Sequence, residues 1–434
     1  MITFSKAGFA AALMIGASSI VAIAPADAKK KEEAPKGPVL SAEFRKPALE
    51  AQTALKAKNI AAAEPAVVAA EAIAKSEDEI YFAQIFRLQL ESDRVQAASN
   101  GNSAAYRRGE VALIKPLEAL IANPKTLATD RARFTFRLGL IQYDQKNYAA
   151  SAVLLKQARD LGETNPDLQL TLVKARIEGG DVMGGAADMQ QAIDAEIAAG
   201  RKPPETWYDY IIPRLAQADK FDDFIRWSQN KLKQYPSAKN WRTLVIYFGF
   251  SGKRSDLLDK QQKIDLFRLL RANNALADLA DYGQYALYLN TSGLPVEAKA
   301  VLDEGTKSGK MALTREDDKA LYAAATSAIK LDGPVAPREA RARASATGIA
   351  SIAVADAYLG EGNYAKAVEL YKVGLGKGVS KPDEVNTRLG IAYALMRDTA
   401  NARAAFALVK AKPRDQIAAF WLAWLDLGGT PATS

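Results

Sequence analysis

Two segments near the end of the chain repeat each other at a fixed interval, and this repetition limits the fold more strongly than any other feature of the sequence. Small and large residues alternate in both copies, as in helices whose backbones approach at the small residue while a ring from the partner helix fills the space beside it. A repeat of this length indicates helical hairpins that stack on one another. We therefore predict an all-α fold, an α-solenoid of stacked antiparallel helix pairs. The repeated pairs, each separated by 35 residues, are Tyr358 and Tyr393, Ala367 and Ala402, and Tyr371 and Phe406.

Further positions of the two segments match a known repeat. In the second segment Leu389 and Gly390 precede Tyr393, and in the first segment the turn at 362–364 reads Gly-Asn-Tyr. The second helix of each copy has the spacing Ala-x-x-x-Tyr or Ala-x-x-x-Phe. With these motifs the segments resemble tetratricopeptide repeats, although the early Trp of that family is absent.

The resemblance implies a right-handed superhelix whose concave groove binds a protein or peptide and performs no chemistry of its own. The groove would be lined by the first helix of each pair. In the second segment it would include Thr387, Ile391 and Ala394, because these residues lie opposite the packing residues of their helix.

The first 28 residues have the composition of a secretory signal peptide. Lys6 precedes the apolar stretch 7–24, and 26–28 reads Ala-Asp-Ala, a small-x-small cleavage site. A retained membrane anchor is the alternative, which the Ala, Gly and Ser content and the cleavage site disfavour. Because the chain has no Cys, it cannot carry the lipid of a bacterial lipoprotein. We expect a periplasmic protein with no transmembrane segment after cleavage.

Composition and periodicity divide the rest of the chain into successive segments. The expected segments are a flexible charged leader at 29–40, a helical region with divergent repeats at 41–130, central tetratricopeptide-like repeats at 131–347, two well-matched repeats at 348–415, a capping helix at 416–427 and a tail at 428–434.

The absence of both His and Cys excludes most kinds of catalytic and metal-binding site. Thiol nucleophiles, Ser-His-Asp triads and most zinc sites need one of these residues, so we expect no enzyme, metal or cofactor. Only paired carboxylates remain, such as Asp303 with Glu304 or the three at 316–318, and these lie among solvated residues. The net charge of +8 comes from interspersed charges, which indicates solvated helix faces rather than a nucleic-acid site.

Three features rise above this background. Trp207, Trp227 and Trp241 lie in an aromatic-rich stretch at 207–250, which fits either core packing or recognition of a peptide or sugar. The basic helix with Arg338, Arg341 and Arg343 is interpreted as a solvated helix end.

The last helix, which reads IAAFWLAWLDL, has two apolar stripes. Ile417, Phe420 and Trp424 share the face expected to pack on the preceding repeat. Trp421 and Leu425 lie on an adjoining stripe, which is either a docking or homo-oligomer surface or part of the last inter-helix groove.

These observations favour a non-enzymatic protein-interaction scaffold of the bacterial cell envelope. The alternative is a factor that binds or exports an envelope polysaccharide or peptidoglycan. An exposed row of Trp207, Trp227 and Trp241 would support the glycan alternative, and burial of these rings would not.

Overall fold

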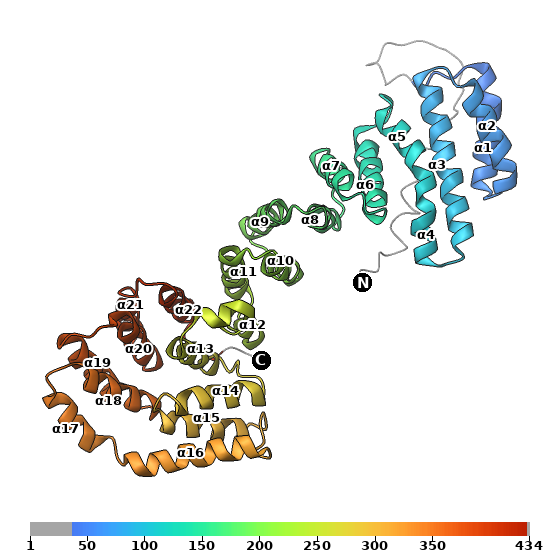
Figure 1. The fold of residues 1–434 in the computed structure, drawn as a ribbon. Coiled ribbons are helices and arrows are strands. Elements are labelled where there is room, and N and C mark those ends of the chain that lie inside the picture. The colour runs from blue at the N-terminus through green and yellow to red at the C-terminus, as the bar shows by residue number, and fades with distance from the viewer. Residues whose placement is uncertain (1–36, 432–434) are drawn as a thin grey trace. The chain divides into compact units, whose positions relative to one another are not determined.

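The computed structural model describes residues 37–431, and every regular element in that range is a helix. The expected signal peptide, most of the leader and residues 432–434 of the tail lie outside the described residues. No described helix is both long and apolar enough to cross a membrane. Consecutive helices pack as pairs that stack on their neighbours (Figure 1), which confirms the predicted all-α solenoid class.

The packing separates the chain into two compact units, with the boundary between Arg201 and Lys202. This boundary falls inside the segment 131–347 that was expected to hold the central repeats. The helices of unit 1 are α1 (Ala42–Lys56), α2 (Ile60–Ile73), α3 (Glu77–Ser99), α4 (Ser103–Gly109), the 3-10 helix η2 (Glu110–Leu113), α5 (Ile114–Ala122), α6 (Ala128–Asp144), α7 (Tyr148–Asp160), α8 (Leu168–Glu178) and α9 (Val182–Ala198).

Unit 2 continues the alternation of helices and short turns. Its helices are α10 (Glu205–Gln217), α11 (Phe221–Gln234), α12 (Ala238–Gly249), the 3-10 helix η3 (Gly252–Leu257), α13 (Lys260–Ala272), α14 (Leu279–Asn290), α15 (Pro295–Lys307), α16 (Glu316–Asp332), α17 (Ala336–Ala344), α18 (Ile349–Gly360), α19 (Tyr364–Gly376), α20 (Pro382–Leu395), α21 (Thr399–Phe406) and α22 (Arg414–Asp426).

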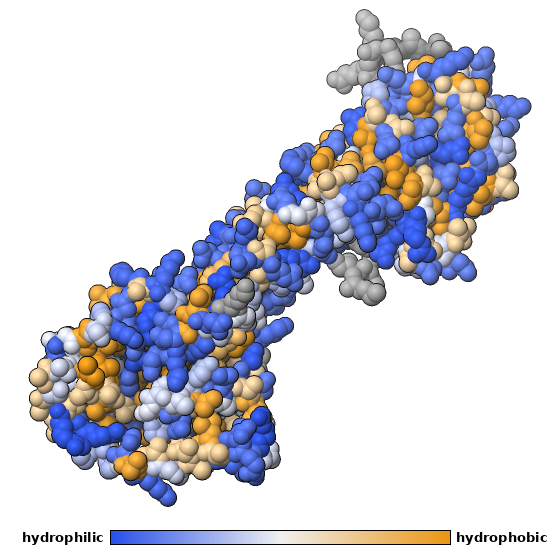
Figure 2. Space-filling view, in the orientation of Figure 1, coloured by the Kyte–Doolittle hydropathy of each residue, from blue (hydrophilic) through white to orange (hydrophobic). Residues whose placement is uncertain are grey.

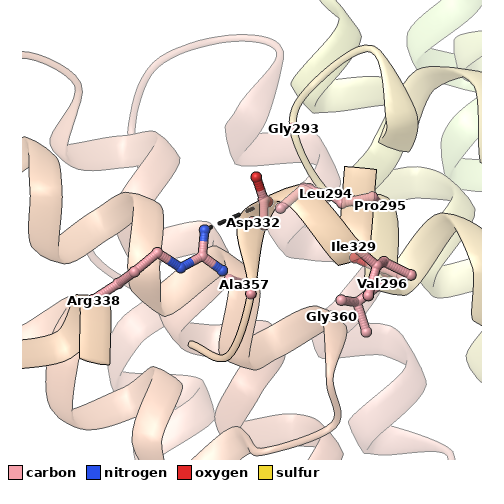
Figure 3. Close-up of a pocket in the computed structure, with 11 residues that line it drawn as sticks. Gly293, Leu294, Pro295, Val296, Ile329, Asp332, Arg338, Ala357 and Gly360 are labelled. Atoms are coloured by element: carbon pink, nitrogen blue, oxygen red, sulfur yellow. Dashed lines mark hydrogen bonds and ion pairs between the residues drawn. The ribbon is translucent and has the colours of Figure 1, made fainter. Parts of the chain in front are cut away.

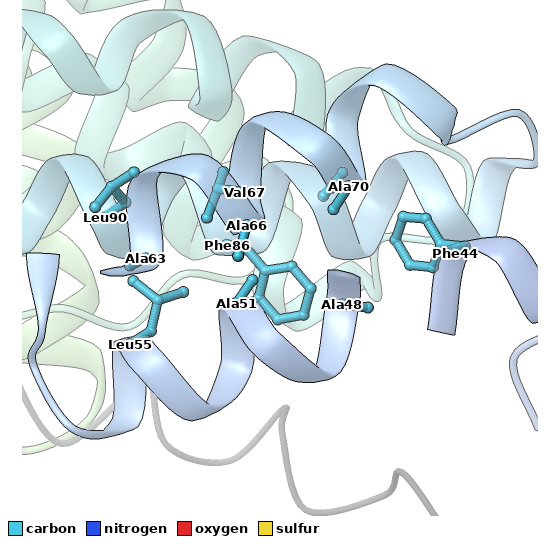
Figure 4. Close-up of a cluster of buried hydrophobic side chains, with 11 residues drawn as sticks. Phe44, Ala48, Ala51, Leu55, Ala63, Ala66, Val67, Ala70, Phe86 and Leu90 are labelled. Carbon is cyan, nitrogen blue, oxygen red and sulfur yellow. The ribbon is translucent and has the colours of Figure 1, made fainter. Parts of the chain in front are cut away.

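Small residues bring the first helices of unit 1 together. Ala48 and Ala51 of α1 are buried in one cluster with Ala63 and Ala66 of α2, and the ring of Phe86 from α3 lies among them (Figure 4). Alanine faces allow the two backbones to approach, and the aromatic ring fills the remaining space. The alternation of small and large residues therefore operates here as well, where the sequence match to the repeat is weak.

The same alternation joins α6 and α7. A Cβ placed on Gly139 would lie 2.8 Å from Cδ2 of Leu155, so only glycine permits this approach. The Ser151 hydroxyl donates a hydrogen bond of 2.7 Å to the Gly139 carbonyl oxygen across the same contact.

In unit 2 the last helix, α22, occupies the space where an open groove was expected. In α13 all residues from 264 to 270 are buried, Asp265 and Arg268 among them. The last helix, α22, contacts α13, α20 and α21, and the Phe420 ring lies 4.9 Å from the Phe248 ring of α12. The end of unit 2 therefore packs back on α12 and α13. The expectation of a continuous groove lined by the first helix of each pair is wrong for this unit.

Candidate functional site

The repeat-packing residues predicted from the sequence lie in the interior of unit 2. A Cβ on Gly390 would come within 2.5 Å of the Phe406 ring, so the glycine makes room for the aromatic ring of the second helix. The buried repeat-packing residues are Tyr358, Ala367, Tyr371, Leu389, Gly390, Tyr393, Ala402 and Phe406.

The residues expected to line the concave groove are buried too. Thr387, Ile391 and Ala394 on α20 have almost no exposed surface. They are covered because α20 is packed by α19, α21 and α22. The expectation that they face a partner is therefore corrected: within unit 2 they are core.

Trp421 and Leu425 are buried too, so of their two alternatives the inter-helix groove is correct and the docking or homo-oligomer surface is wrong. Trp421 is 0% exposed and stacks on Phe406 of α21 with ring centroids 6.5 Å apart. Phe420, which was assigned to the preceding repeat, instead meets Phe248 of α12. Both stripes of α22 are used because the helix lies between two parts of the unit, so no docking or oligomer surface is left at Trp421.

The aromatic-rich stretch is mainly core. Trp227 and Trp241 are buried, and Trp227 packs edge-on against Tyr208 at 5.9 Å. Trp207 is half-buried. The three rings do not form the exposed row that stacking on a sugar chain requires.

The basic helix α17 is held by ion pairs at its ends. Arg338 lies 3.5 Å from Asp332 and Arg343 lies 2.9 Å from Glu369. Arg338 also borders a recess between the ends of α15, α16 and α18 (Figure 3). The recess measures about 20 Å³, which is room for roughly one water molecule, so it cannot hold a ligand.

The carboxylates considered for catalysis do not assemble into a reactive pair. Asp303 pairs with Lys299 at 2.6 Å and accepts a hydrogen bond from Tyr322 at 2.9 Å, while Glu304 pairs with Arg271 at 2.7 Å. Within residues 37–431 there is no group of three carboxylates placed to hold a metal ion. Within the triplet at 316–318, Asp317 and Asp318 differ, because they line a groove.

An open groove of about 560 Å³ lies between α14 and α16. One wall of the groove is a face of α14, on which the lining residues follow one another at helical spacing, and the other wall is the first turns of α16. Figure 2 shows weakly polar and apolar residues along the middle of the edge that α16 forms in Figure 1, and hydrophilic residues at the right-hand end, where α16 begins. The groove is lined by Asp278, Leu279, Ala280, Gly283, Gln284 and Leu287 on the α14 side and by Arg315, Asp317, Asp318 and Leu321 on the α16 side.

The groove is open for two structural reasons. Gly283 contributes no side chain, and a Cβ placed there would find only Asp318 Oδ1, at 3.8 Å. In α16 only Asp318 and Ala325 are buried. Gly333, at φ +65°, ends the helix, and α17 then packs on α18, so α16 rests mainly on α14 and α15.

Asp318 is the unusual side chain of this groove. Its exposed fraction is 8%, yet its Oδ2 atom accepts no hydrogen bond from the described residues. The nearest cation is the Nε atom of Arg315, at 3.9 Å. Asp318 is the third residue of α16, where the helix dipole favours a negative charge but supplies no donor to Oδ2.

The rim adds further negative charge over an apolar floor. Asp317 is exposed, and the Asp278 carboxylate caps α14 by accepting from the Ala280 amide at 3.0 Å. Arg315 is the one basic residue of the lining. Leu287, 46% exposed, provides apolar surface between these charges.

A buried ionic network fixes the opposite face of α14. The Tyr285 hydroxyl donates to Glu297 at 2.6 Å, and Arg268 donates two hydrogen bonds to the same carboxylate, at 3.0 and 2.7 Å. Burial opposes ionisation of Glu297, but the Arg268 guanidinium holds its pKa below the usual value. Burial also raises the pKa of Tyr285 well above its ordinary value. At neutral pH Glu297 is therefore charged and Tyr285 neutral, and α14 is held firmly on α13 and α15.

The sequence pointed to part of this site for another reason. Asp317 and Asp318 were considered as carboxylates for catalysis. Gly283 and Leu287 were not singled out. The regular spacing of Ala280, Gly283 and Leu287 was the available signal, but it does not reveal that α16 leaves this face uncovered.

No family model matches the sequence, and no curated protein sequence is significantly similar to it. The chain is similar to the solved structure of the pentatricopeptide repeat protein PPR10 from maize, with 12% identity, a TM-score of 0.30 and coverage of 91% of this chain and 62% of the maize chain. It is also similar to the apo form of RapI, with 14% identity, a TM-score of 0.27 and coverage of 77% of this chain and 97% of the RapI chain.

A third similar structure is a Rap protein complexed with competence and sporulation factor, with 12% identity and a TM-score of 0.24. The match covers 87% of this chain and 99% of the Rap chain. The chain thus spans less than two thirds of the maize protein. TM-scores this low do not align individual sites. The chain is a helical repeat protein on the evidence of its own stacked helix pairs.

Proposed function

We propose that this protein is a non-enzymatic scaffold that binds a protein or peptide partner, and that the groove between α14 and α16 is the binding surface. The observation that supports this proposal is the groove itself, an open channel of about 560 Å³ with an apolar floor and a charged rim. Its volume is within the range of about 300–1,000 Å³ that is usual for ligand sites. One of its walls, α14, is held by the buried hydrogen bond from Tyr285 to Glu297, the carboxylate that Arg268 also binds, so the surface exists before the partner arrives.

The partner is expected in the bacterial envelope. The signal peptide predicted at residues 1–28 supports export to the periplasm. This part of the proposal is tested by fractionating cells that produce the full chain and determining the N-terminus of the mature protein by mass spectrometry. Export with cleavage gives a protein that begins at Lys29, and recovery of an intact N-terminus in the cytoplasm contradicts it.

The binding role is tested by filling the groove. Gly283→Leu places a branched side chain in the channel, and the change favours the helix because leucine has a higher helix propensity than glycine. Gly376→Leu in α19 is the matched control, since a Cβ at Gly376 meets nothing within 4 Å. Each tagged protein is used to capture proteins from an envelope extract, and the captured proteins are identified by mass spectrometry.

A protein bound by the natural chain and by Gly376→Leu but lost with Gly283→Leu is the expected result. Equal recovery with all three chains contradicts a partner site between α14 and α16. The glycan alternative gains no support from the tryptophans, because Trp227 and Trp241 are buried.

A further inference from the structure

The α14–α16 groove contains a carboxylate, that of Asp318, with one oxygen atom that receives no hydrogen bond from the described residues. Asp318 is more than nine-tenths buried, and its Oδ2 atom has no donor among the described residues. A buried charge whose ion-pair partner comes no closer than 3.9 Å is poorly compensated, and the helix N-terminus offsets only part of that cost. The exposed part of Asp318 lines the groove, with Oδ1 opposite Gly283, and a cation from outside the chain would there compensate the carboxylate charge.

The charges of the lining define that donor. Asp278, Asp317 and Asp318 are opposed by Arg315 alone, so the lining carries an excess of two negative charges. The Arg315 side chain is 62% exposed and approaches Asp318 only to 3.9 Å. A cationic side chain can therefore approach without displacing a strong internal ion pair, whereas an anionic ligand is repelled.

The space beside Asp318 suits the stem of a long basic side chain. Gly283 leaves room opposite the carboxylate, and Leu287 and Leu321 provide apolar surface within the same groove. Lysine and arginine place their methylene groups along such surfaces while the charged end reaches a polar partner. An aliphatic neighbour in the ligand would cover the remaining leucine surface.

We propose that the groove recognises a partner segment that inserts a lysine or arginine side chain toward Asp318 and places an adjacent aliphatic residue on the leucine floor. The inference rests on the proposed binding function and adds the chemistry of the partner. Asp318 sets the specificity through charge, and Gly283 sets it through space.

A selection experiment separates this inference from the binding function itself. A displayed library of random dodecapeptides is selected against the full-length mature protein, and peptides that also bind Gly283→Leu are removed. The expected survivors contain Lys or Arg next to an aliphatic residue. Survivors without enrichment in basic residues overturn the cation inference but keep the groove as a binding site. No groove-dependent survivors overturn both.

The role of Asp318 is then measured with the best selected peptide by fluorescence anisotropy. Asp318→Asn removes the charge with little change in shape, and a charged hydrogen bond of this kind corresponds to roughly a 10- to 100-fold loss of affinity. Glu316→Gln is the matched control on the same turn, because its carboxylate pairs outward with Lys319 at 2.8 Å. The control is expected to change affinity by less than about threefold, as for an exposed ion pair.

Folding and salt controls complete the test. Asp318→Asn should melt close to the natural chain, because it breaks no hydrogen bond to Oδ2. Binding should weaken with added salt for the natural chain and much less for Asp318→Asn. Equal affinity of Asp318→Asn and Glu316→Gln for the basic peptide overturns the assignment of Asp318.

Discussion

The Nη1 atom of Arg414 donates a 2.9 Å hydrogen bond to Oδ2 of Asp265 across 149 residues of sequence. Asp265 lies on α13 and Arg414 is the first residue of α22, so this contact joins the last helix of unit 2 to one near its start. Arg268 and Arg388 also lie within 4 Å of the same carboxylate, at 3.0 and 3.9 Å. One aspartate therefore contributes to the charge compensation of three buried guanidinium groups and helps to close the unit.

Removal of this carboxylate is expected to destabilise unit 2 strongly. Asp265→Ala leaves the charges of buried arginines incompletely compensated. Because an uncompensated buried charge is costly, the free energy of unfolding is expected to fall by about 3–5 kcal/mol. All five tryptophans lie between residues 207 and 424, inside unit 2, so urea unfolding followed by tryptophan fluorescence reports this unit. Asp256→Ala, on the exposed segment η3, is the control. Equal midpoints for the two variants would contradict the compensating role of Asp265.

A second prediction concerns the pH dependence of unit 1. The Glu79 carboxylate accepts hydrogen bonds from the backbone amides of Ser41, at 2.9 Å, and of Lys75 and Ser76, at 2.9 and 3.2 Å. The Ser41 side chain contributes most to lowering the pKa of Glu79 from 4.5 to about 2, and the three amides of Lys75, Ser41 and Ser76 lower it further. The lowered pKa means that the charged form stabilises the fold above pH 4.5, and that this stabilisation is lost as the pH falls from 4.5 toward 2.

Glu79→Gln should therefore be less stable than the natural chain at pH 7, by about 1–3 kcal/mol, and the difference should shrink as the pH falls below 4.5. Unfolding is followed by circular dichroism, because unit 1 contains no tryptophan. Glu77→Gln is the control, since Glu77 is an exposed residue of the same helix turn. A difference that stays constant from pH 7 to pH 3 would show that the Glu79 charge is not involved.

The sequence was sufficient to predict the fold class because the repeat depends on local pairs such as Ala367 with Tyr371, which recur at a fixed period. The sequence could not predict that the last helix of unit 2 packs back on α13 of the same unit. The contact between Arg414 and Asp265 depends on small rotations that accumulate over the intervening helices, and no periodic pattern records their sum. The burial of Thr387 and Trp421 follows from that closure. Because the closure could not be predicted, Thr387 was assigned to an open groove and an open surface stayed one of two alternatives for Trp421.

The fate of Trp421 gives a third prediction. Trp421→Ala removes a fully buried ring that stacks on Phe406, and such a change costs about 3–5 kcal/mol of unfolding free energy. The molecular mass in size-exclusion chromatography with light scattering should stay that of the natural chain. Leu408→Ala is the control, because Leu408 is an exposed side chain just after α21. An altered mass with unchanged stability would restore the idea that Trp421 forms an intermolecular surface.

The last prediction tests the small residue at the centre of the repeat. Gly390→Ala brings a methyl group within 2.5 Å of the Phe406 ring, so the ring or α21 must move, at a cost of about 1–3 kcal/mol. In Phe406→Leu the ring is absent, and the added cost of Gly390→Ala should be smaller in that background by an amount that a double-mutant cycle measures. Gly376→Ala is the control: it adds a methyl group in open space on α19 and should be neutral or stabilising, because alanine favours the helix. If Gly390→Ala costs the same with and without the Phe406 ring, the contact between these two residues does not set the distance between α20 and α21.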